Sequence, residues 1–128
     1  MQPKFLNVDL EIESASPLDL IATAMGKRVD VLHPGPAARH GRHLLVLESA
    51  RYLKKPDPAI HALCAVVESL PPAARRIWSA SRREFDVGYE LRSSERSARF
   101  SLRPDTLERV ARLGATLTVT YYRADTTR

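Results

Sequence analysis

Residues 5–13 of the chain read FLNVDLEIE, and this stretch decides the class of fold. Apolar and polar side chains alternate along it with a period of two, which is typical of a β-strand with one buried and one solvated face. Because the apolar face has to be covered, we expect a sheet with a second layer packed on one side. The side chains predicted to face the core are Leu6, Val8, Leu10 and Ile12. Those predicted to face solvent are Asn7, Asp9, Glu11 and Glu13.

The residues that follow predict a helix and then two more strands. Residues 16–26 read SPLDLIATAMG, with Ser16 as a cap, a proline in the first helical position and Gly26 as the end of the helix. Residues 28–33 and 43–53 are short and apolar-rich, and they predict one strand each.

Two helices are predicted in the middle of the chain. The first covers residues 56–70 with Asp57 as its cap, and the second covers residues 72–83 with Trp78 turned inward. The apolar stripe of the first helix consists of Ile60, Leu63, Cys64, Val67 and Leu70. Because Cys64 lies on this stripe, we expect a buried, inert thiol and not a nucleophile.

The C-terminal part predicts a hairpin, a helix and a last strand. Residues 84–92 and 97–103 form the two predicted hairpin strands, joined by a turn at 93–96. A helix at 104–114 and an alternating strand at 115–123 follow. The helix residues predicted to point inward are Leu107, Val110, Ala111 and Leu113.

The predicted order is therefore βαββααββαβ. We expect a single α+β domain over residues 1–124, with a largely antiparallel sheet, helices packed on one face, and a frayed C-terminal tail at 125–128. No apolar run is long enough to span a bilayer, and the single cysteine fits a reducing cytoplasm. The arginine- and alanine-rich composition is typical of a GC-rich bacterial genome.

Three of the four histidines lie in HPGPAARHGRH, residues 33–43. His33, His40 and His43 could form a metal or anion site only if this loop folded back on itself. Two arginines among them oppose cation binding, and the Pro and Gly residues are turn formers. We therefore interpret the stretch as a connection between two strands, and we expect no metal and no other cofactor.

The solvated face of the sheet is the candidate binding surface. Such a face is flat, mixed in charge and rich in threonine, which suits another protein or a second copy of the chain better than a small molecule. An unpaired strand edge is the competing route for such an association. The residues predicted to form this surface are Asp9, Glu11, Arg99, Arg103, Thr118, Thr120 and Tyr122.

The net charge of +5 arises entirely in residues 71–128. A candidate basic patch there consists of Arg75, Arg76, Arg82 and Arg83. Nucleic-acid binding would need these side chains on one continuous face, and the chain carries no RNP-like or helix-turn-helix pattern. We therefore expect no nucleic-acid partner, although a basic nucleic-acid-binding module stays an alternative.

The pattern FDVGYEL, followed by FSLRPDTLERVARLGATLTVTYY, resembles the C-terminal half of the bacterial domain-of-unknown-function family numbered 4279. The early NVDLEIES and PLDLIATAMG are similar to the opening strand and helix of that family. The resemblance implies no catalytic residues. It implies a small accessory protein, or an immunity-type protein that neutralises a specific partner.

No motif in the chain predicts catalysis. The glycines match neither a P-loop nor a dinucleotide fingerprint, and no serine lies in a nucleophile elbow. We therefore expect a cytoplasmic protein-binding or accessory module that is not an enzyme and does not associate with membranes. A hydrolase whose site matches none of these motifs stays an alternative.

Overall fold

The computed structural model describes residues 3–32, 37–92 and 97–124. The predicted turn at 93–96, the predicted tail at 125–128 and His33 lie outside these residues. The strands are β1 (Lys4–Ser14), β2 (Val29–Val31), β3 (Ala37–Arg39), β4 (Arg42–Ser49), β5 (Arg82–Leu91) and β6 (Thr116–Arg123). The helices are α1 (Asp19–Met25), the 3₁₀ turn η1 (Gly26–Arg28), α2 (Pro56–Glu68), α3 (Pro72–Ala80) and α4 (Pro104–Arg112).

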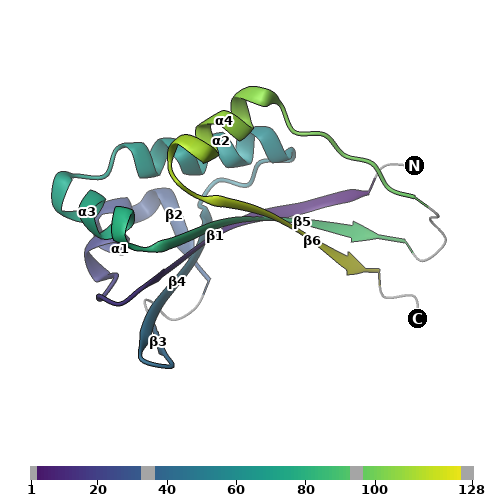
Figure 1. Ribbon diagram of the computed structural model, residues 1–128. Coiled ribbons are helices and arrows are strands. Elements are labelled where there is room, and N and C mark those ends of the chain that lie inside the picture. The colour runs from purple at the N-terminus through teal and green to yellow at the C-terminus, as the bar shows by residue number, and fades with distance from the viewer. Residues whose placement is uncertain (1–2, 33–36, 93–96, 125–128) are drawn as a thin grey trace.

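One sheet runs through the described part of the chain, in the order β2-β4-β1-β5-β6, and β3 pairs with β4 beside β2. All pairings are antiparallel except that of β5 with β6. The helices lie together on one face of this sheet, and the other face is open (Figure 1). The predicted α+β class, with helices on one side of a largely antiparallel sheet, is confirmed.

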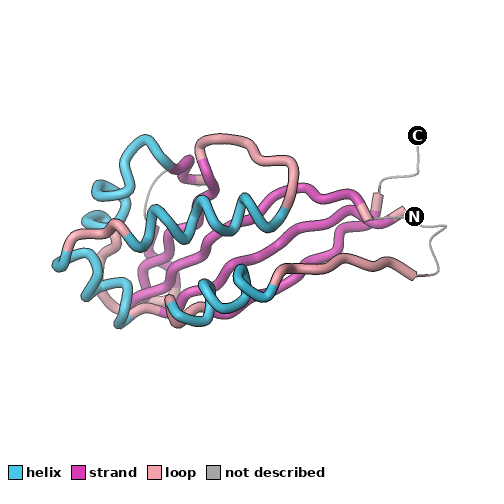
Figure 2. Tube along the Cα trace, turned by 90° about the horizontal axis from the view of Figure 1, so that it is seen from above, coloured by secondary structure: helices cyan, strands magenta, loops and turns pink. Residues whose placement is uncertain are grey.

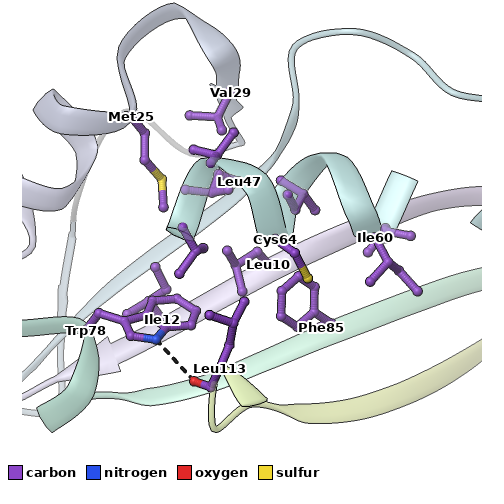
Figure 3. Close-up of a cluster of buried hydrophobic side chains, with 14 of the residues drawn as sticks. Leu10, Ile12, Met25, Val29, Leu47, Ile60, Cys64, Trp78, Phe85 and Leu113 are labelled. Atoms are coloured by element: carbon purple, nitrogen blue, oxygen red, sulfur yellow. Dashed lines mark hydrogen bonds between the residues drawn. The ribbon is translucent and has the colours of Figure 1, made fainter. Parts of the chain in front are cut away.

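The core lies between the sheet and the helices (Figure 3). The α2 stripe is confirmed, because Ile60, Leu63, Cys64 and Val67 are each no more than 1% exposed. Trp78 of α3 is buried as predicted, and its indole Nε1 donates a hydrogen bond of 3.2 Å to the carbonyl of Leu113. Burial raises the pKa of the Cys64 thiol to about 11, which favours the inert thiol.

Strand β1 follows the predicted alternation with one exception. A register shift between Phe5 and Asn7 in the pairing with β5 changes the phase of the strand at its start. Phe5 therefore packs against the core, with its ring 5.9 Å from that of Tyr89, and Leu6 is only partly buried. From Val8 onward the alternation is as predicted.

Two helix starts differ from the prediction. Leu18, not Ser16, occupies the N-cap position of α1, and no side chain caps this helix. The N-cap residue of α2 is Lys55, so Asp57 lies inside the first turn. The Asp57 carboxylate is therefore available to another helix, and it accepts hydrogen bonds from the first turn of α4.

The predicted strand at 97–103 is wrong. These residues form no strand, and Phe100 and Leu102 pack against the core on the side of the helices. In Figure 1 this segment lies above the sheet, on the side of the helices, and leads into α4; Figure 2 shows it from above. Its crossover role explains the error, because β5 and β6 are parallel and need a connection that returns over one face.

The inward face of α4 is also rotated relative to the prediction. Thr106 is fully buried, whereas Leu107 is 45% exposed and Ala111 is exposed. Val110 and Leu113 point inward as predicted. The polar contacts of Thr106 with α2, described below, stabilise this rotation.

Candidate functional site: the open face of the sheet

The open face of the sheet carries a dense set of carboxylates. We call it the acidic face, and it is formed by Asp9, Glu11 and Glu13 of β1, Asp30 of β2, Glu48 of β4, and Glu84 and Asp86 of β5. The inward residues between them on β1, β4 and β5 are fully buried, so strand alternation places these acids on the solvent side.

Four of the carboxylates form a row across four neighbouring strands. Asp30 is the register partner of Glu48, and Asp9 is the register partner of Asp86. Glu48 and Asp9 are joined by the side chain of Asn7, whose Nδ2 donates to Asp9 Oδ1 at 2.9 Å and to Glu48 Oε2 at 3.3 Å. The row therefore concentrates negative charge in a line perpendicular to the strands.

Asp9 lies in the middle of this row. Burial, together with the neighbouring carboxylates of Glu48, Asp86 and Glu11, raises the pKa of Asp9 from an ordinary value of 3.8 to about 6. Because the folded-state pKa is raised, the ionised carboxylate destabilises the fold above about pH 6, and this penalty disappears as the pH falls toward 4.

Asp9→Asn should therefore stabilise the protein at about pH 8. Without solvent screening, the raised pKa of Asp9 would correspond to a loss of about 3 kcal/mol in folding free energy. Because this group is partly exposed, screening lowers the stability gain expected for Asp9→Asn to about 1–2 kcal/mol. The Asn7 hydrogen bond is retained, since asparagine keeps Oδ1. Urea unfolding at about pH 8 and about pH 4 measures the effect, with Asp19→Asn on α1 as an exposed control. A gain that is equal at the two pH values would contradict the assignment.

A hollow of about 290 Å³ lies on the acidic face, between β1 and the β3–β4 hairpin. Its lining consists of Glu11, Glu13, His40, Arg42 and Leu44. A smaller hollow of about 130 Å³ adjoins it and adds Arg82 and Glu84. Arg42 already binds Glu13, whereas Leu44 with the carboxylates of Glu11 and Glu84 offers a surface for the alkyl stem and cationic head of a further lysine or arginine.

The cations at the acidic face come from residues other than those predicted. Arg42 Nε bonds Glu13 Oε2 at 2.8 Å, and Arg82 is the register partner of Glu13. Arg99 is exposed in the 97–103 segment, and Arg103 lies at the start of α4, where its Nε bonds Asp105 Oδ1 at 3.2 Å. Both predicted arginines therefore belong to the helical side and not to the open face.

The β6 residues of the predicted surface do lie on the open face. The Thr118 hydroxyl donates to Glu84 Oε2 at 2.6 Å, and the Thr120 hydroxyl donates to Asp86 Oδ1 at 2.7 Å. Tyr122 lies over Gly88, where a Cβ atom would come within 3.5 Å of its ring. The structure thus brings together Asp9, Glu11, Thr118, Thr120 and Tyr122 of the predicted set.

The four arginines of the predicted basic patch do not share one surface. Arg75 Nη1 donates to the carbonyls of Val67 and Glu68 at the end of α2. Arg83 Nη1 donates to the Trp78 carbonyl at 2.8 Å, and its guanidinium lies 5.7 Å from the Trp78 ring centre. Arg76 is exposed on α3, and Arg82 lines the smaller hollow on the acidic face. Two of the four therefore hold the fold together.

The histidine stretch contains a hairpin turn. His40 and Gly41 both have positive φ, 53° and 76°, between the paired residues Arg39 and Arg42. Two such residues between paired strand ends form a type I′ turn, so the interpretation as a connection is confirmed at these positions. The prediction missed β3, which precedes the turn. No group of three or more His, Cys, Asp or Glu side chains in the described residues could hold a metal ion.

His61 belongs to a polar network that joins α2 to α4. Its Nδ1 accepts from Arg109 Nη1 at 2.8 Å, so the neutral ring carries its proton on Nε2, which lies 3.1 Å from the Thr106 hydroxyl. That hydroxyl donates to Asp57 Oδ1 at 2.5 Å, and Arg109 also forms a two-bond pair with Glu68. The Thr106 hydroxyl is fully buried, so the network has the contacts of a structural clamp and not of a nucleophile.

Four carboxylates of the acidic face are not among the predicted site residues: Asp30, Glu48, Glu84 and Asp86. A signal for them was present, because each occupies the polar phase of a predicted strand at 28–33, 43–53 or 84–92. Their gathering into one row depends on the strand order, which places β1 between β4 and β5.

Comparisons with known proteins do not assign this chain to a group. No family model, no curated protein and no solved structure matches it. None of the helices in the described residues is long and apolar enough to cross a membrane. The function of the candidate site therefore has to be inferred from its geometry alone.

Proposed function

We propose that this protein is a non-enzymatic binding module that holds a lysine- or arginine-rich segment of another protein on its acidic face. The observation that carries the proposal is the row of Asp30, Glu48, Asp9 and Asp86 across four neighbouring strands. Like charges opposite one another destabilise a sheet, so this row has a stability cost that a cationic partner would relieve.

The adjoining hollow supports a protein partner. Leu44 offers an apolar surface to the methylene groups of a basic side chain, and the carboxylates of Glu11 and Glu84 lie beside it. The same charges repel phosphate groups. Since Arg75 and Arg83 are held by backbone carbonyls on the helical side, nucleic acid is the less favoured partner.

Binding of a fluorescent lysine- and arginine-rich peptide, followed by fluorescence anisotropy, tests the proposal. The double variant Asp30→Asn/Glu48→Gln should weaken binding roughly tenfold, because two partly exposed charge contacts of up to about 1 kcal/mol each are lost. The matched control Asp19→Asn/Glu108→Gln removes the same net charge from the helical side and should change the affinity less than twofold. Equal losses in the two double variants, or tighter binding of mixed-sequence RNA than of the peptide, would refute the proposal.

The affinity for this peptide should also fall as the pH decreases through about 6. Protonation of Asp9, whose pKa is raised to about 6, removes one negative charge from the middle of the row. Asp9→Asn should bind more weakly than the parent at about pH 8 and should lose most of the pH dependence between about 5 and 7. Anisotropy titrations of both proteins across this range measure the difference. A parent protein with constant affinity across the range would contradict this role of Asp9.

A further inference from the structure

Strand β6 forms one edge of the sheet. It pairs with β5 along its whole length, from Thr116 to Arg123, and no other strand of the described residues pairs with its outer side. The backbone N–H and C=O groups on that side are a template for another strand.

This edge lacks the usual protection against pairing. The sequence of β6 is TLTVTYYR, which contains no proline, glycine or lysine and has its one charged residue at the end. The opposite edge differs, because it consists of the two short strands β2 and β3, each three residues long, and carries Asp30 at the centre of β2. Long, uncharged edges recruit strands, whereas short and charged edges resist them.

The helix above this edge exposes apolar side chains on the same side. Leu107 is 45% exposed, and it lies two residues from Arg109, which is nearly opposite on the helix and binds Glu68 and His61 of α2. Leu107 therefore faces away from α2, toward the outer side of the sheet, where Figure 2 shows α4. On β6, Tyr121 is 43% exposed on the strand face that packs under the helices.

We propose that two copies of the chain associate through β6, with their edges paired antiparallel about a two-fold axis. An axis near Val119 sets Thr118 of one copy against Thr120 of the other, and Leu117 against Tyr121. Such Thr–Thr and aliphatic–aromatic pairs stabilise antiparallel sheets. No charged side chain faces a like charge in this register. The self-complementary strand therefore fits a second copy of the chain, which has the closed symmetry common among homodimers.

The pairing would make one continuous sheet with all helices on the same side. The exposed Leu107 side chains of the two copies would approach each other above the paired edges. The two acidic faces would lie on the opposite side, with their β5 strands three strand spacings apart, about 14 Å. This separation exceeds the Debye length of about 8 Å at physiological salt, so repulsion between the acidic faces is largely screened. The dimer does not depend on the proposed function.

Sedimentation velocity of the full chain over a range of concentrations tests the dimer. Leu107→Lys and Tyr121→Lys should each raise the dimer dissociation constant at least tenfold, with an unchanged circular dichroism spectrum. The matched controls are Leu20→Lys on α1, where Leu20 is 46% exposed, and Tyr52→Lys, where Tyr52 is 66% exposed. Both controls should dimerise as the parent does. Added salt should not weaken the dimer, because the interface contains no ion pairs and each copy carries a net charge of +5.

Amide hydrogen exchange locates the interface. Amides of Thr116–Arg123 should exchange more slowly as the dimer forms, whereas those of β2 and β3 should not change. A parent protein that stays monomeric at several hundred micromolar would overturn the proposal. A dimer that both lysine variants leave intact, or one that salt disperses while β6 exchange stays constant, would also overturn it and would point to contacts through the acidic face.

Discussion

Leu63→Ala is expected to lower the free energy of unfolding by about 2–5 kcal/mol, as large-to-small substitutions in well-packed cores do. Leu63 lies on the buried stripe of α2, is 1% exposed, and belongs to the cluster that joins this helix to β1 and β4. Truncation to alanine removes several methyl and methylene groups and leaves a cavity that the rigid sheet below can close only in part.

Chemical denaturation followed by circular dichroism measures this effect. Leu20→Ala on α1 is the matched control, because Leu20 is 46% exposed and the same truncation should cost no more than about 0.5 kcal/mol. Equal stabilities of the Leu63→Ala variant and the parent would mean that the packing of α2 on the sheet is not the one described.

Thr106→Val is expected to cost about 2–3 kcal/mol, although the two side chains have nearly the same shape. The Thr106 hydroxyl is fully buried, donates to the Asp57 carboxylate at 2.5 Å and lies 3.1 Å from His61 Nε2. Valine has no hydroxyl, so both of these contacts are lost at once. Loss of a hydrogen bond to a charged group costs more than loss of a neutral one, and His61 Nε2 loses its 3.1 Å contact with the hydroxyl.

Two companion variants separate the hydroxyl from the methyl group. Thr106→Ser keeps the hydroxyl and should recover most of the stability in the same denaturation experiment. Thr118→Val removes a hydroxyl that also binds a carboxylate, that of Glu84, but on the solvated face, and should cost less than about 1 kcal/mol. If Thr106→Val were as stable as the parent, the network between α2 and α4 would not contribute to stability.

The clamp between α2 and α4 also affects the proposed dimer. Arg109 and Thr106 hold α4 in the rotation that buries Thr106 and exposes Leu107. A rotation that buried Leu107, as the apolar spacing of this helix predicts, would remove the apolar flank from the edge. The polar contacts with α2 therefore determine which side chains of α4 are exposed to a partner.

The sequence by itself determined the elements whose local pattern agrees with their final environment. The alternation in β1 predicts which side chains face solvent from Val8 onward, and the stripe from Ile60 to Val67 predicts the buried side of α2. Such patterns need only the period of the element and one buried side. The turn at His40–Gly41 is equally local, because it depends on residues that adopt positive φ.

Only the tertiary structure decided the features that join distant parts of the chain. Residues 97–103 are apolar enough for a strand, but the parallel pairing of β5 with β6 requires them to cross over the helical side. From the sequence, Asp57 is predicted to cap its own helix. In the fold its carboxylate instead accepts a hydrogen bond from Thr106, 49 residues away. The acidic row likewise depends on β1 lying between β4 and β5, since strand order and register, which local periodicity does not encode, bring Asp30, Glu48, Asp9 and Asp86 together.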